Sequence, residues 1–492
     1  MTDHVDVLIV GAGLSGIGAA YRLAERAPTK TYAILEQRER IGGTWDLFRY
    51  PGVRSDSDMY TLSYPFEPWT NPASIADGAD IREYLDRTAA KHGVADHIRF
   101  GRRVDSAEWS SEDATWTVTS TLADGSAEVV TASFLYLCSG YYSYEEGYTP
   151  DFPGLETFGG EVVHPQFWPE DLDYAGKKVV IVGSGATAIT LLPSMAREAE
   201  SVTMLQRTPT YVLSQPARDP LAIAARKILP NQLVHHVSRL GHAVATVGFY
   251  LFCRAFPRAS RSLLLGLSSK SMPGVDRRDI TPPYKPWDQR LCVVPGGDLY
   301  KSVRSGRSQI VTDRVAEFTP TGITLASGRH LDADVVVTAT GLKLVALGQI
   351  DLTIDGTKVD PHELYTYKGA MFSGVPNLAW CVGYTNASWT LRADLTWKYV
   401  ADFINHLDAN GYAFGMPDPT ADFGDDARIL DLESGYIARA DELLPRSGGR
   451  QPWRIRQNWF LDSWDAKRTD LDEEMVWVRR QDLPLTSTEV VA

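Results

Sequence analysis

Two segments of the chain, residues 5–36 and 177–208, predict an α/β fold that contains two dinucleotide-binding units. Each segment runs from a short β-branched, apolar stretch into a glycine-rich turn, an apolar helix and a second short strand. This succession is typical of a Rossmann-like unit, in which the turn and the start of the helix face the ligand. We therefore expect two Rossmann-like dinucleotide-binding domains, with a helical insertion at about residues 215–285 in the second.

The first unit carries "VDVLIVGAGLSG", in which Gly11, Gly13 and Gly16 form a GxGxxG motif. The first glycine makes the tight turn, the second lets backbone approach a pyrophosphate, and the third lets helix and strand pack closely. Glu36 ends the next strand, where a carboxylate accepts hydrogen bonds from a ribose diol. The first unit is therefore predicted to bind FAD or NAD.

The second unit carries "VVIVGSGATAITLL", with Gly183, Gly185 and Ala188 in the pattern GxGxxA. At the ribose position stands Arg207, with Thr208 beside it, instead of an acid. Arginine there suits the 2′-phosphate of NADP, which a carboxylate would repel. We expect this unit to bind NADPH; the alternative is that Arg207 is only a solvated surface charge.

Two stretches, "FLYLCSGYY" near Gly140 and "VVVTATGLK" at residues 335–343, predict where the chain crosses between the units. They divide it into an FAD-binding part at residues 1–142, an NADP-binding domain at residues 143–339, and a second FAD-binding part with a C-terminal segment at residues 340–492.

Composition excludes several classes of protein. The net charge of −13 speaks against a nucleic acid partner, because phosphate backbones require a basic surface. The four cysteines form no CxxC pair and lack metal-ligand spacing, so no metal site is predicted. The first residues lack the pattern of a secretory signal, and we expect a cytoplasmic protein. Residues 243–253 are an apolar run too short to span a membrane, interpreted as a buried helix, with a peripheral membrane-surface contact as the alternative.

Two dinucleotide sites in one chain suggest a flavin that NADPH reduces. A disulfide reductase would need a redox-active CxxC, which the sequence lacks. The reduced flavin would therefore pass its electrons to oxygen or to a partner protein.

The linker before the second unit reads "FGGEVVHPQFWP", and its residues Phe158, Gly160, His164, Trp168 and Pro169 resemble the signature of the flavin-dependent Baeyer–Villiger monooxygenases. The stretch "GGTWDLFRYPGVRSD" resembles that family's other signature. Further blocks, such as "LQRTPTYVLSQP" and "VGYTNASWTLRADL", are similar to the ethionamide-activating branch of the family. Together these blocks cover nearly the whole chain.

The resemblance implies an NADPH- and oxygen-dependent FAD enzyme that converts ketones to esters or lactones through a peroxyflavin. It also implies oxidation of sulfides, including thioamide- or thioether-type compounds. Its partners would be a small-molecule ketone or sulfide and molecular oxygen. A dedicated sulfur- or nitrogen-oxygenating flavin monooxygenase is the alternative within this chemistry. A flavin reductase or electron carrier is the alternative from a different class.

The resemblance assigns two catalytic residues. Arg290 in "PWDQRLC" would be the essential arginine beside the flavin, and Asp56 its acidic partner. Where relatives commonly carry Lys-Arg, this chain has Gln289 before Arg290, so selectivity for NADPH would rest more heavily on Arg207. The remaining cofactor contacts that the resemblance implies are Ser15, Thr44, Trp45, Asp46, Leu47, Arg54, Ser55, Val104, Ser184, Ala186, Thr187 and Ile189.

Three roles are open to His164 in the linker: fixing the connector while the NADPH domain rotates, direct cofactor contact, and proton transfer. We favour the first, a gating role that Trp168 shares. For Trp389 the sequence leaves two alternatives, a wall of the substrate pocket or ordinary core.

Overall fold

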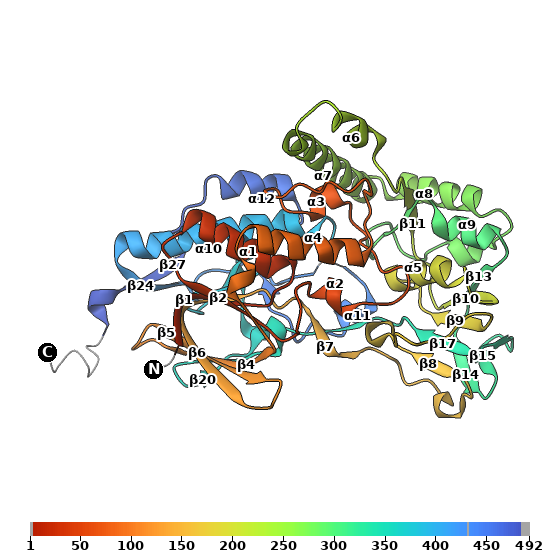
Figure 1. The fold of residues 1–492 in the computed structure, drawn as a ribbon, viewed down its shortest axis with the longest axis horizontal. Helices are drawn as coiled ribbons and strands as arrows, with labels where there is room; N and C mark the ends of the chain where they lie inside the picture. Colours follow the sequence, from red (N-terminus) through yellow and green to blue (C-terminus); the bar gives the residue numbers. More distant parts are fainter. Residues whose placement is uncertain (1–2, 431, 484–492) are drawn as a thin grey trace.

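The computed structural model describes residues 3–430 and 432–483, and within them it confirms the predicted α/β fold. Two sheets lie side by side along the long axis of the molecule (Figure 1). The first half is built around a large mixed sheet. The second half is built around a smaller sheet whose strands are all parallel.

The first sheet has the strand order β20-β19-β4-β5-β6-β1-β2-β3, with β23 paired to β6. Its strands are β1 (Asp3–Val10), β2 (Tyr32–Glu36), β3 (Ile98–Phe100), β4 (Arg102–Ser110), β5 (Thr115–Leu122), β6 (Ala127–Leu137), β19 (Asp351–Ile354), β20 (Thr357–Lys358) and β23 (Leu378–Trp380). Along β1, Leu8 and Val10 pack into one core while Val7 and Ile9 pack into the core on the opposite face. Burial on both faces explains why the second half of this strand, residues 7–10, is uniformly apolar.

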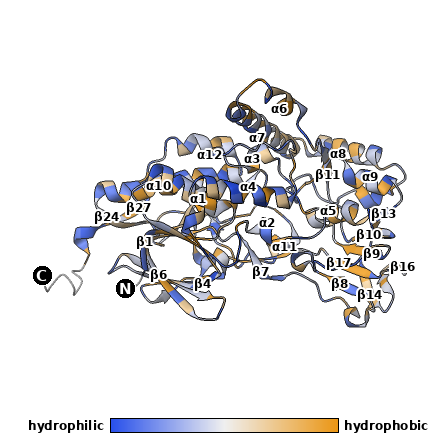
Figure 2. Ribbon diagram, in the orientation of Figure 1, coloured by the Kyte–Doolittle hydropathy of each residue, from blue (hydrophilic) through white to orange (hydrophobic). Residues whose placement is uncertain are grey.

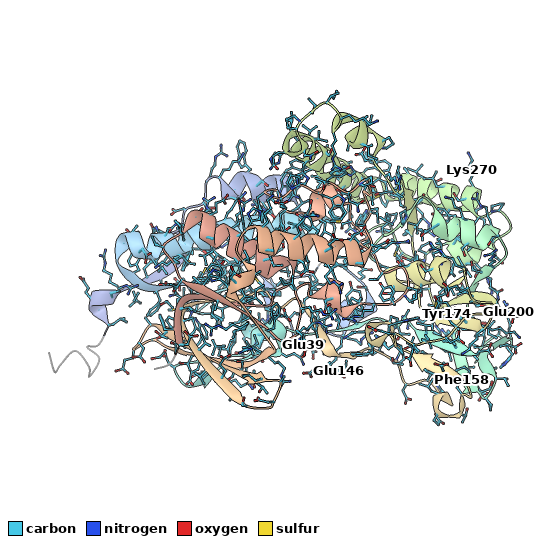
Figure 3. The ribbon with its side chains drawn as sticks, in the orientation of Figure 1. Glu39, Glu146, Phe158, Tyr174, Glu200 and Lys270 are labelled. Carbon is cyan, nitrogen blue, oxygen red and sulfur yellow. The ribbon has the colours of Figure 1, made fainter. Side chains whose placement is uncertain are left out.

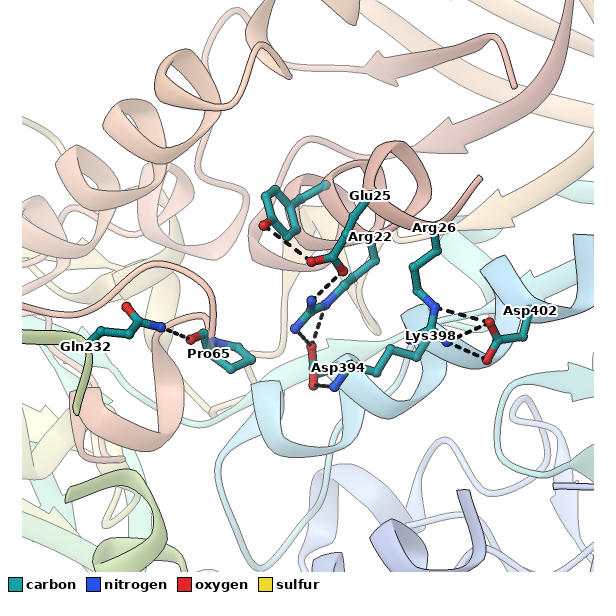
Figure 4. Close-up of polar contacts among 9 residues, drawn as sticks. Arg22, Glu25, Arg26, Pro65, Gln232, Asp394, Lys398 and Asp402 are labelled. Carbon is teal, nitrogen blue, oxygen red and sulfur yellow. Dashed lines mark hydrogen bonds and ion pairs between the residues drawn. The ribbon is translucent and has the colours of Figure 1, made fainter. Parts of the chain in front are cut away.

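Helices cover the first sheet and are joined to one another by ion pairs. The main ones are α1 (Leu14–Arg26), α4 (Gly78–Lys91) and α10 (Trp389–Asn410), with the short α2 (Thr44–Leu47) and α3 (Met59–Leu62) between α1 and α4. Arg22 of α1 donates to Asp394 of α10 through both Nε and Nη2, at 2.9 and 2.7 Å (Figure 4). Arg26 binds Asp402, about two helical turns further along α10. These contacts fix α10 beside α1.

The second sheet has the order β13-β10-β9-β17-β8. Its strands are β8 (Glu161–Val163), β9 (Lys178–Val182), β10 (Ser201–Gln206), β13 (Ser308–Thr312) and β17 (Val335–Thr338), accompanied by the helices α5 (Ala186–Met195) and α9 (Asp298–Arg304) and the antiparallel strands β14 (Val315–Thr319), β15 (Gly322–Leu325) and β16 (His330–Asp332). Figure 2 shows the strongly apolar character of β17, as expected for a central strand covered on both faces.

A helical insertion follows β10, as the sequence predicts, and comprises α6 (Pro220–Ala225), α7 (Asn231–Ala255) and α8 (Pro257–Ser271). The prediction of a buried helix at residues 243–253 is only half right, because α7 buries Ala243, Val247 and Cys253 and leaves Val244 and Leu251 exposed. One face of α7 packs on the body of the protein, and the other face is exposed in the described part of the chain. Among the described residues, no helix has the length and apolar content that a bilayer crossing would require.

The chain passes between the two halves in two adjacent strands. These are β7 (Tyr142–Gly147) and β18 (Leu342–Leu344), which pair antiparallel with Gly147 opposite Leu342. All five strands of the second sheet lie between these two crossings in the sequence. The boundaries at 142/143 and 339/340 remain predictions, and the paired crossings lie next to them.

Candidate functional site

A single cavity of about 1240 Å³ lies between the two halves, and both glycine-rich turns open into it. Gly11 and Gly13 line it from the carboxyl end of β1, and Gly183 and Gly185 line it from the carboxyl end of β9. Ligands of open α/β sheets bind at this end of the strands. Two nucleotides bound by the two turns would therefore share one space.

The first turn leaves no room for side chains at Gly11 and Gly16. Gly11 has φ +102°, and a Cβ there would lie 2.8 Å from the carbonyl oxygen of Cys138. A Cβ on Gly16 would lie 1.8 Å from the carbonyl oxygen of Gly11, so helix α1 packs directly against the turn. Gly13 and Gly43 face each other, since a Cβ on Gly43 would lie 3.1 Å from the Cα of Gly13. Two stretches of bare backbone thus border the cavity.

Glu36 lies behind this turn, 4% exposed and at the edge of the cavity. Its two carboxylate oxygens accept hydrogen bonds from the backbone N–H groups of Ala12 (2.7 Å) and Arg38 (2.9 Å). Burial raises the pKa of Glu36, and these two backbone hydrogen bonds oppose that shift. The carboxylate is thus held where it can accept from a ribose diol. Backbone cradle and acid together fit the adenosine diphosphate portion of FAD.

The second turn fits a phosphorylated nucleotide. Ser184 Oγ donates to the carbonyl oxygen of Thr208 at 2.8 Å and ties the turn to the end of β10. Arg207, the residue after β10, lines the cavity with an exposed side chain and forms no hydrogen bond or ion pair with another described residue. An unpaired guanidinium at this place can bind the 2′-phosphate of NADP. Gln289 also lines the cavity.

Arg290 and Asp56 meet at the junction of the two halves. Arg290 Nη2 lies 3.1 Å from each oxygen of the Asp56 carboxylate, and Nη1 donates to the carbonyl oxygen of Thr385 at 2.6 Å. Burial alone would lower the pKa of Arg290, but the charge of Asp56 raises it above its ordinary value. Both residues line the cavity, so a fixed positive charge stands where the two nucleotides would meet.

Aromatic residues form a second part of the cavity wall. Trp389, at the start of α10, stacks on Tyr141 with ring centroids 5.3 Å apart and donates from Nε1 to Ser15 Oγ at 2.9 Å. Both rings line the cavity, together with Tyr436. The structure thus places Trp389 in the pocket wall. Sequence reasoning missed Tyr141 and Tyr436, although the "SGYY" stretch at the first crossing offered a signal for Tyr141.

The linker histidine bridges the two crossings. His164 Nδ1 accepts from the backbone N–H of Gln166 at 3.2 Å, so Nε2 carries the proton and donates to the carbonyl oxygen of Gly341 at 3.4 Å. Its ring packs against Gly147, where a Cβ would lie 2.1 Å from the imidazole. Burial lowers the pKa of His164 and favours this neutral form. His164 therefore touches the last residue of β7 and the residue before β18 while lining the cavity.

Most of the predicted site residues line this cavity, and they come from both halves of the chain. They are Gly11, Gly13, Ser15, Glu36, Thr44, Trp45, Ser55, Asp56, Val104, His164, Gly183, Ser184, Gly185, Ala186, Thr187, Arg207, Thr208 and Arg290. The other predicted site residues are not part of the cavity lining. They are Gly16, Asp46, Leu47, Arg54, Phe158, Gly160, Trp168, Ala188 and Ile189.

Two of the residues that do not line the cavity, Asp46 and Arg54, are held by ion pairs. Asp46 is buried and accepts from Arg38 at 2.7 Å, with Arg49 and Arg82 at 3.5 and 3.4 Å. Arg54 donates to Asp298 at the start of α9, with Nη1 2.5 Å from Oδ2. Both therefore support the segment 44–56, whose Thr44, Trp45, Ser55 and Asp56 line the cavity.

The outer part of the linker supports the second sheet. Phe158 packs against Phe318 of β14 with ring centroids 5.9 Å apart, and Figure 3 shows it at the edge of this half, away from the centre of the molecule. A Cβ on Gly160 would lie 2.2 Å from the carbonyl oxygen of Asp334. Trp168 packs against the core of the same half. These residues hold the linker against the second sheet.

Residues 5–223 match the family model described as flavin-binding monooxygenase-like. The chain is 50% identical over 477 residues to the FAD-containing monooxygenase EthA of Mycolicibacterium smegmatis, which covers 96% of this chain and 97% of that relative. It is 47% identical to the putative FAD-containing monooxygenase MymA of Mycobacterium tuberculosis, over 94% of this chain and 95% of the relative. It is 45% identical to the probable FAD-binding monooxygenase AlmA of Acinetobacter baylyi, over 96% of each chain.

Solved structures share the fold at lower sequence identity. An oxidised steroid monooxygenase bound to NADP superposes with a TM-score of 0.75 at 23% identity, over 97% of this chain and all of the other. Cyclohexanone monooxygenase from Rhodococcus sp. Phi1, bound to NADP+, gives the same TM-score at 20% identity and the same coverage. The two-sheet architecture is therefore common to these proteins.

Proposed function

This chain belongs to the flavin-binding monooxygenase-like family and is an oxygen-dependent flavoprotein monooxygenase that uses FAD and NADPH, and from that premise we propose its reaction. It inserts one oxygen atom between the carbonyl carbon of a ketone and a neighbouring carbon to give an ester or lactone, and it also oxygenates sulfides and thioamides. The observation that carries the proposal is the Arg290–Asp56 pair in the cavity that both glycine-rich turns share. The overall reaction consumes ketone, O2, NADPH and a proton, and yields ester, NADP+ and water.

We assign FAD to the first turn. Backbone at Gly11, Gly13 and Gly43 would hold its pyrophosphate, and Glu36 its ribose. The ring would reach the part of the cavity lined by Thr44 and by Trp389, with Val104 near the adenine end. When bound and reduced, the flavin supplies the activated oxygen for the reaction.

We assign NADPH to the second turn. Backbone at Gly183 and Gly185 and the start of α5 would hold the pyrophosphate. The unpaired guanidinium of Arg207 would bind the 2′-phosphate, with Thr208 beside it. Gln289 adds no charge at this site, so discrimination of NADPH from NADH rests on Arg207.

Arg290 binds the negative charge that develops on oxygen during the reaction. Its guanidinium stays protonated because Asp56 stabilises the cation, and the carbonyl of Thr385 fixes its direction. A preorganised cation in a partly enclosed cavity stabilises an oxyanion without reorganising, an effect worth about 3–4 kcal/mol for a single donor. The same group polarises the ketone carbonyl that is attacked. Sulfide oxygenation needs no such oxyanion and depends less on Arg290.

His164 controls the angle between the two halves. It joins both crossings in its neutral form, so a rotation of the second half would change its contacts with Gly147 and Gly341 together. Its Nδ1 is occupied by the N–H of Gln166, and its Nε2 proton is donated to a backbone carbonyl. This arrangement supports gating of the hydride-transfer and oxygenation steps over a role as proton carrier.

We place the enzyme in the cytoplasm. Its four cysteines, Cys138, Cys253, Cys292 and Cys381, are all buried free thiols, a usage that suits a reducing compartment.

The test is product analysis with the FAD-loaded enzyme, NADPH and oxygen, using a methyl ketone and an aryl methyl sulfide as separate substrates. Wild type should form ester and sulfoxide. Arg290→Ala should lose ester formation by about 100- to 1000-fold while NADPH still reduces its flavin at the wild-type rate. Arg290→Lys, which keeps the charge without the planar fork, should be intermediate. Sulfoxide without ester from the wild type across a broad ketone panel would point to a dedicated sulfur oxygenase.

A further inference from the structure

The exposed face of α7 is apolar along its length. Leu233, Val237, Leu240, Val244 and Leu251 recur at intervals of three, four or seven residues, and all are exposed. Because these spacings bring side chains to one side of an α-helix, the five residues form a continuous stripe. Val237 in the middle of the stripe is 64% exposed. Isolated exposed apolar residues are common, but a stripe of this length on one helix is not.

The two neighbouring helices extend this surface. Leu221 of α6 and Ile228 in the loop after it are 83% and 82% exposed. On α8, Leu263 and Leu267 lie one turn apart and are exposed. Phe256, the residue before the helix, is also exposed. α6 and α7 project from the top of the molecule, and α8 continues along the same side (Figure 1). We call the exposed apolar residues of α6, α7 and α8 the insertion face.

The inner face of α7 is packed on the body of the protein. The exposure of the insertion face is therefore not explained by a helix that lies detached from the rest of the fold. Arg239 is buried and donates from Nη1 to the carbonyl oxygens of Tyr60, Thr61 and Ser63 at 2.9, 2.9 and 2.8 Å. Ala243 packs beside Tyr384 in a separate apolar cluster. Gln232 Nε2 also donates to the carbonyl oxygen of Pro65 at 3.1 Å (Figure 4).

The charge of this segment is opposite to that of the whole chain. Residues 220–271 contain no aspartate or glutamate, although the chain carries a net charge of −13. Their cations are Arg226, Lys227, Arg239, Arg254, Arg258, Arg261 and Lys270. Within the described part of the chain, Lys227, Arg258 and Lys270 are exposed and form no ion pair. Figure 3 shows Lys270 extending outward from α8.

We propose that the insertion face docks on the surface of a bilayer that contains anionic lipids. An amphipathic helix with an apolar face and cationic flanks is the usual form of such a contact, in which apolar side chains enter the boundary between headgroups and acyl chains. The unpaired cations add attraction to the negative surface potential. A second copy of the same face is disfavoured as the occupant, because a symmetric contact would bring cations together without any acid to oppose them.

The experiment measures flotation of the full-length FAD-loaded protein with vesicles, without substrate or NADPH. Vesicles of phosphatidylcholine with about 30% phosphatidylglycerol should bind the protein, and vesicles of phosphatidylcholine alone should bind it at least tenfold more weakly. Salt at about 1 M should abolish most of the electrostatic contribution to binding and so reduce the difference between the two kinds of vesicle. Because neither catalysis nor reduction is measured, the outcome is independent of the proposed oxygenation.

Two variants test the two parts of the surface. Reversing the three unpaired cations (Lys227→Glu, Arg258→Glu and Lys270→Glu) should weaken binding to the anionic vesicles by at least about 100-fold, since the loss of each cation alone costs about fivefold. Replacing Val237 and Leu240 with serine should weaken binding to both kinds of vesicle. A control reverses three exposed arginines elsewhere, Arg40, Arg87 and Arg480, and should bind nearly as wild type.

Binding that is equal for both kinds of vesicle, or equally weakened by the control, would overturn the proposal. Sedimentation of the protein without vesicles tests the other possible occupant of the insertion face, a second copy of the chain. If the chain self-associates and Val237→Ser with Leu240→Ser abolishes that association, the insertion face is an interface between copies, and the membrane proposal is wrong.

Discussion

Arg290 and Asp56 are separated by 234 residues in the sequence, and the fold brings them together with Nη2 3.1 Å from both carboxylate oxygens. Arg290 follows the helical insertion in the second half, and Asp56 lies in the first half. The pair is therefore a contact between the two halves as well as a charged group in the cavity. Any rotation of one half against the other changes the position of this guanidinium.

Asp56→Ala should uncouple NADPH oxidation from product formation. Without the carboxylate, the carbonyl of Thr385 is the one hydrogen-bond partner left to the guanidinium of Arg290 among the described residues. We expect ester formation to fall by about tenfold or more, with a matching rise in hydrogen peroxide released per NADPH consumed. Asp56→Glu should recover part of the coupling. Unchanged coupling in Asp56→Ala would show that Asp56 does not position Arg290.

Arg207→Ala should weaken binding of 2′,5′-ADP and leave 5′-AMP binding unchanged. The guanidinium forms no ion pair within the described chain, so its loss removes only a ligand contact. A charge-assisted hydrogen bond is worth about 1.5–3 kcal/mol, which corresponds to roughly 10- to 150-fold in the dissociation constant. Titration calorimetry gives both constants. Equal losses for the two nucleotides would indicate damage to the fold instead.

Gln289→Lys should have the opposite effect. Gln289 lines the cavity next to Arg290 in the sequence, and a lysine there would place a second cation in the cavity. We expect tighter binding of 2′,5′-ADP and a larger preference for NADPH over NADH in steady-state kinetics. The matched neutral change Gln289→Met should not produce this preference.

Gly183→Ala and Gly185→Ala should separate stability from binding. A Cβ on Gly183, which has φ +146°, would lie 2.2 Å from the carbonyl oxygen of Ala339, so we expect about 1–3 kcal/mol of destabilisation in denaturant unfolding. A Cβ on Gly185 meets no described atom within 4 Å, so Gly185→Ala should unfold as wild type. It should nevertheless weaken NADP+ binding, because the added methyl group lies where the pyrophosphate approaches. Equal unfolding midpoints for the two variants would contradict this assignment.

His164→Gln should change the dependence of thermal stability on pH. Burial lowers the pKa of His164, so the folded protein favours the neutral ring. Its contribution is complete above the ordinary histidine value of about 6.5 and is lost as the pH falls through the lowered folded value. We therefore expect the difference in melting temperature between wild type and His164→Gln to shrink on acidification. A difference that grows on acidification would mean that the folded protein favours the protonated ring.

Asp394→Asn should destabilise the first half far more than Asp402→Asn on the same helix. Asp394 and Arg22 are both largely buried, and Asp394→Asn leaves Arg22 with only the more exposed Glu25 as an ionic partner, at a cost of about 1.5–3 kcal/mol. The Arg26–Asp402 pair is solvent-exposed, and its loss should cost about 0–1 kcal/mol. Chemical denaturation of the two variants compares them. Lys398 and Arg22 outweigh burial and lower the pKa of Asp394, so its contribution is present above about pH 4 and is lost as the pH falls through the lowered value.

The sequence predicts those features that depend on neighbouring residues. Gly11, Gly16 and Glu36 are placed by one strand–turn–helix unit, and the structure puts them together as that unit requires. Arg54 could not be placed in the same way, because its partner Asp298 lies 244 residues away and draws its guanidinium to the start of α9.

The sequence also could not predict how deeply an apolar segment is buried. The run at residues 243–253 has the composition of a core helix, and its sequence does not reveal that only one face of the helix packs against the protein. The same limit applies to Asp46. The family resemblance suggests a place for Asp46 beside the cofactor, whereas its surroundings in the fold are the guanidinium groups of Arg38, Arg49 and Arg82.

The pairing of β7 with β18 has an architectural consequence. Gly147 and Leu342 are register partners, so the ends of the segment 148–341 lie next to each other although almost 200 residues separate them. A domain whose two ends are adjacent can be inserted into a host loop without disturbing the host. The segment 148–341, which carries the second glycine-rich turn, is thus joined to the first half as an inserted domain. If FAD binds at the first turn as proposed, swapping residues 148–341 with those of a relative should transfer the reductant preference, together with Arg207 and Arg290, and leave the first half continuous.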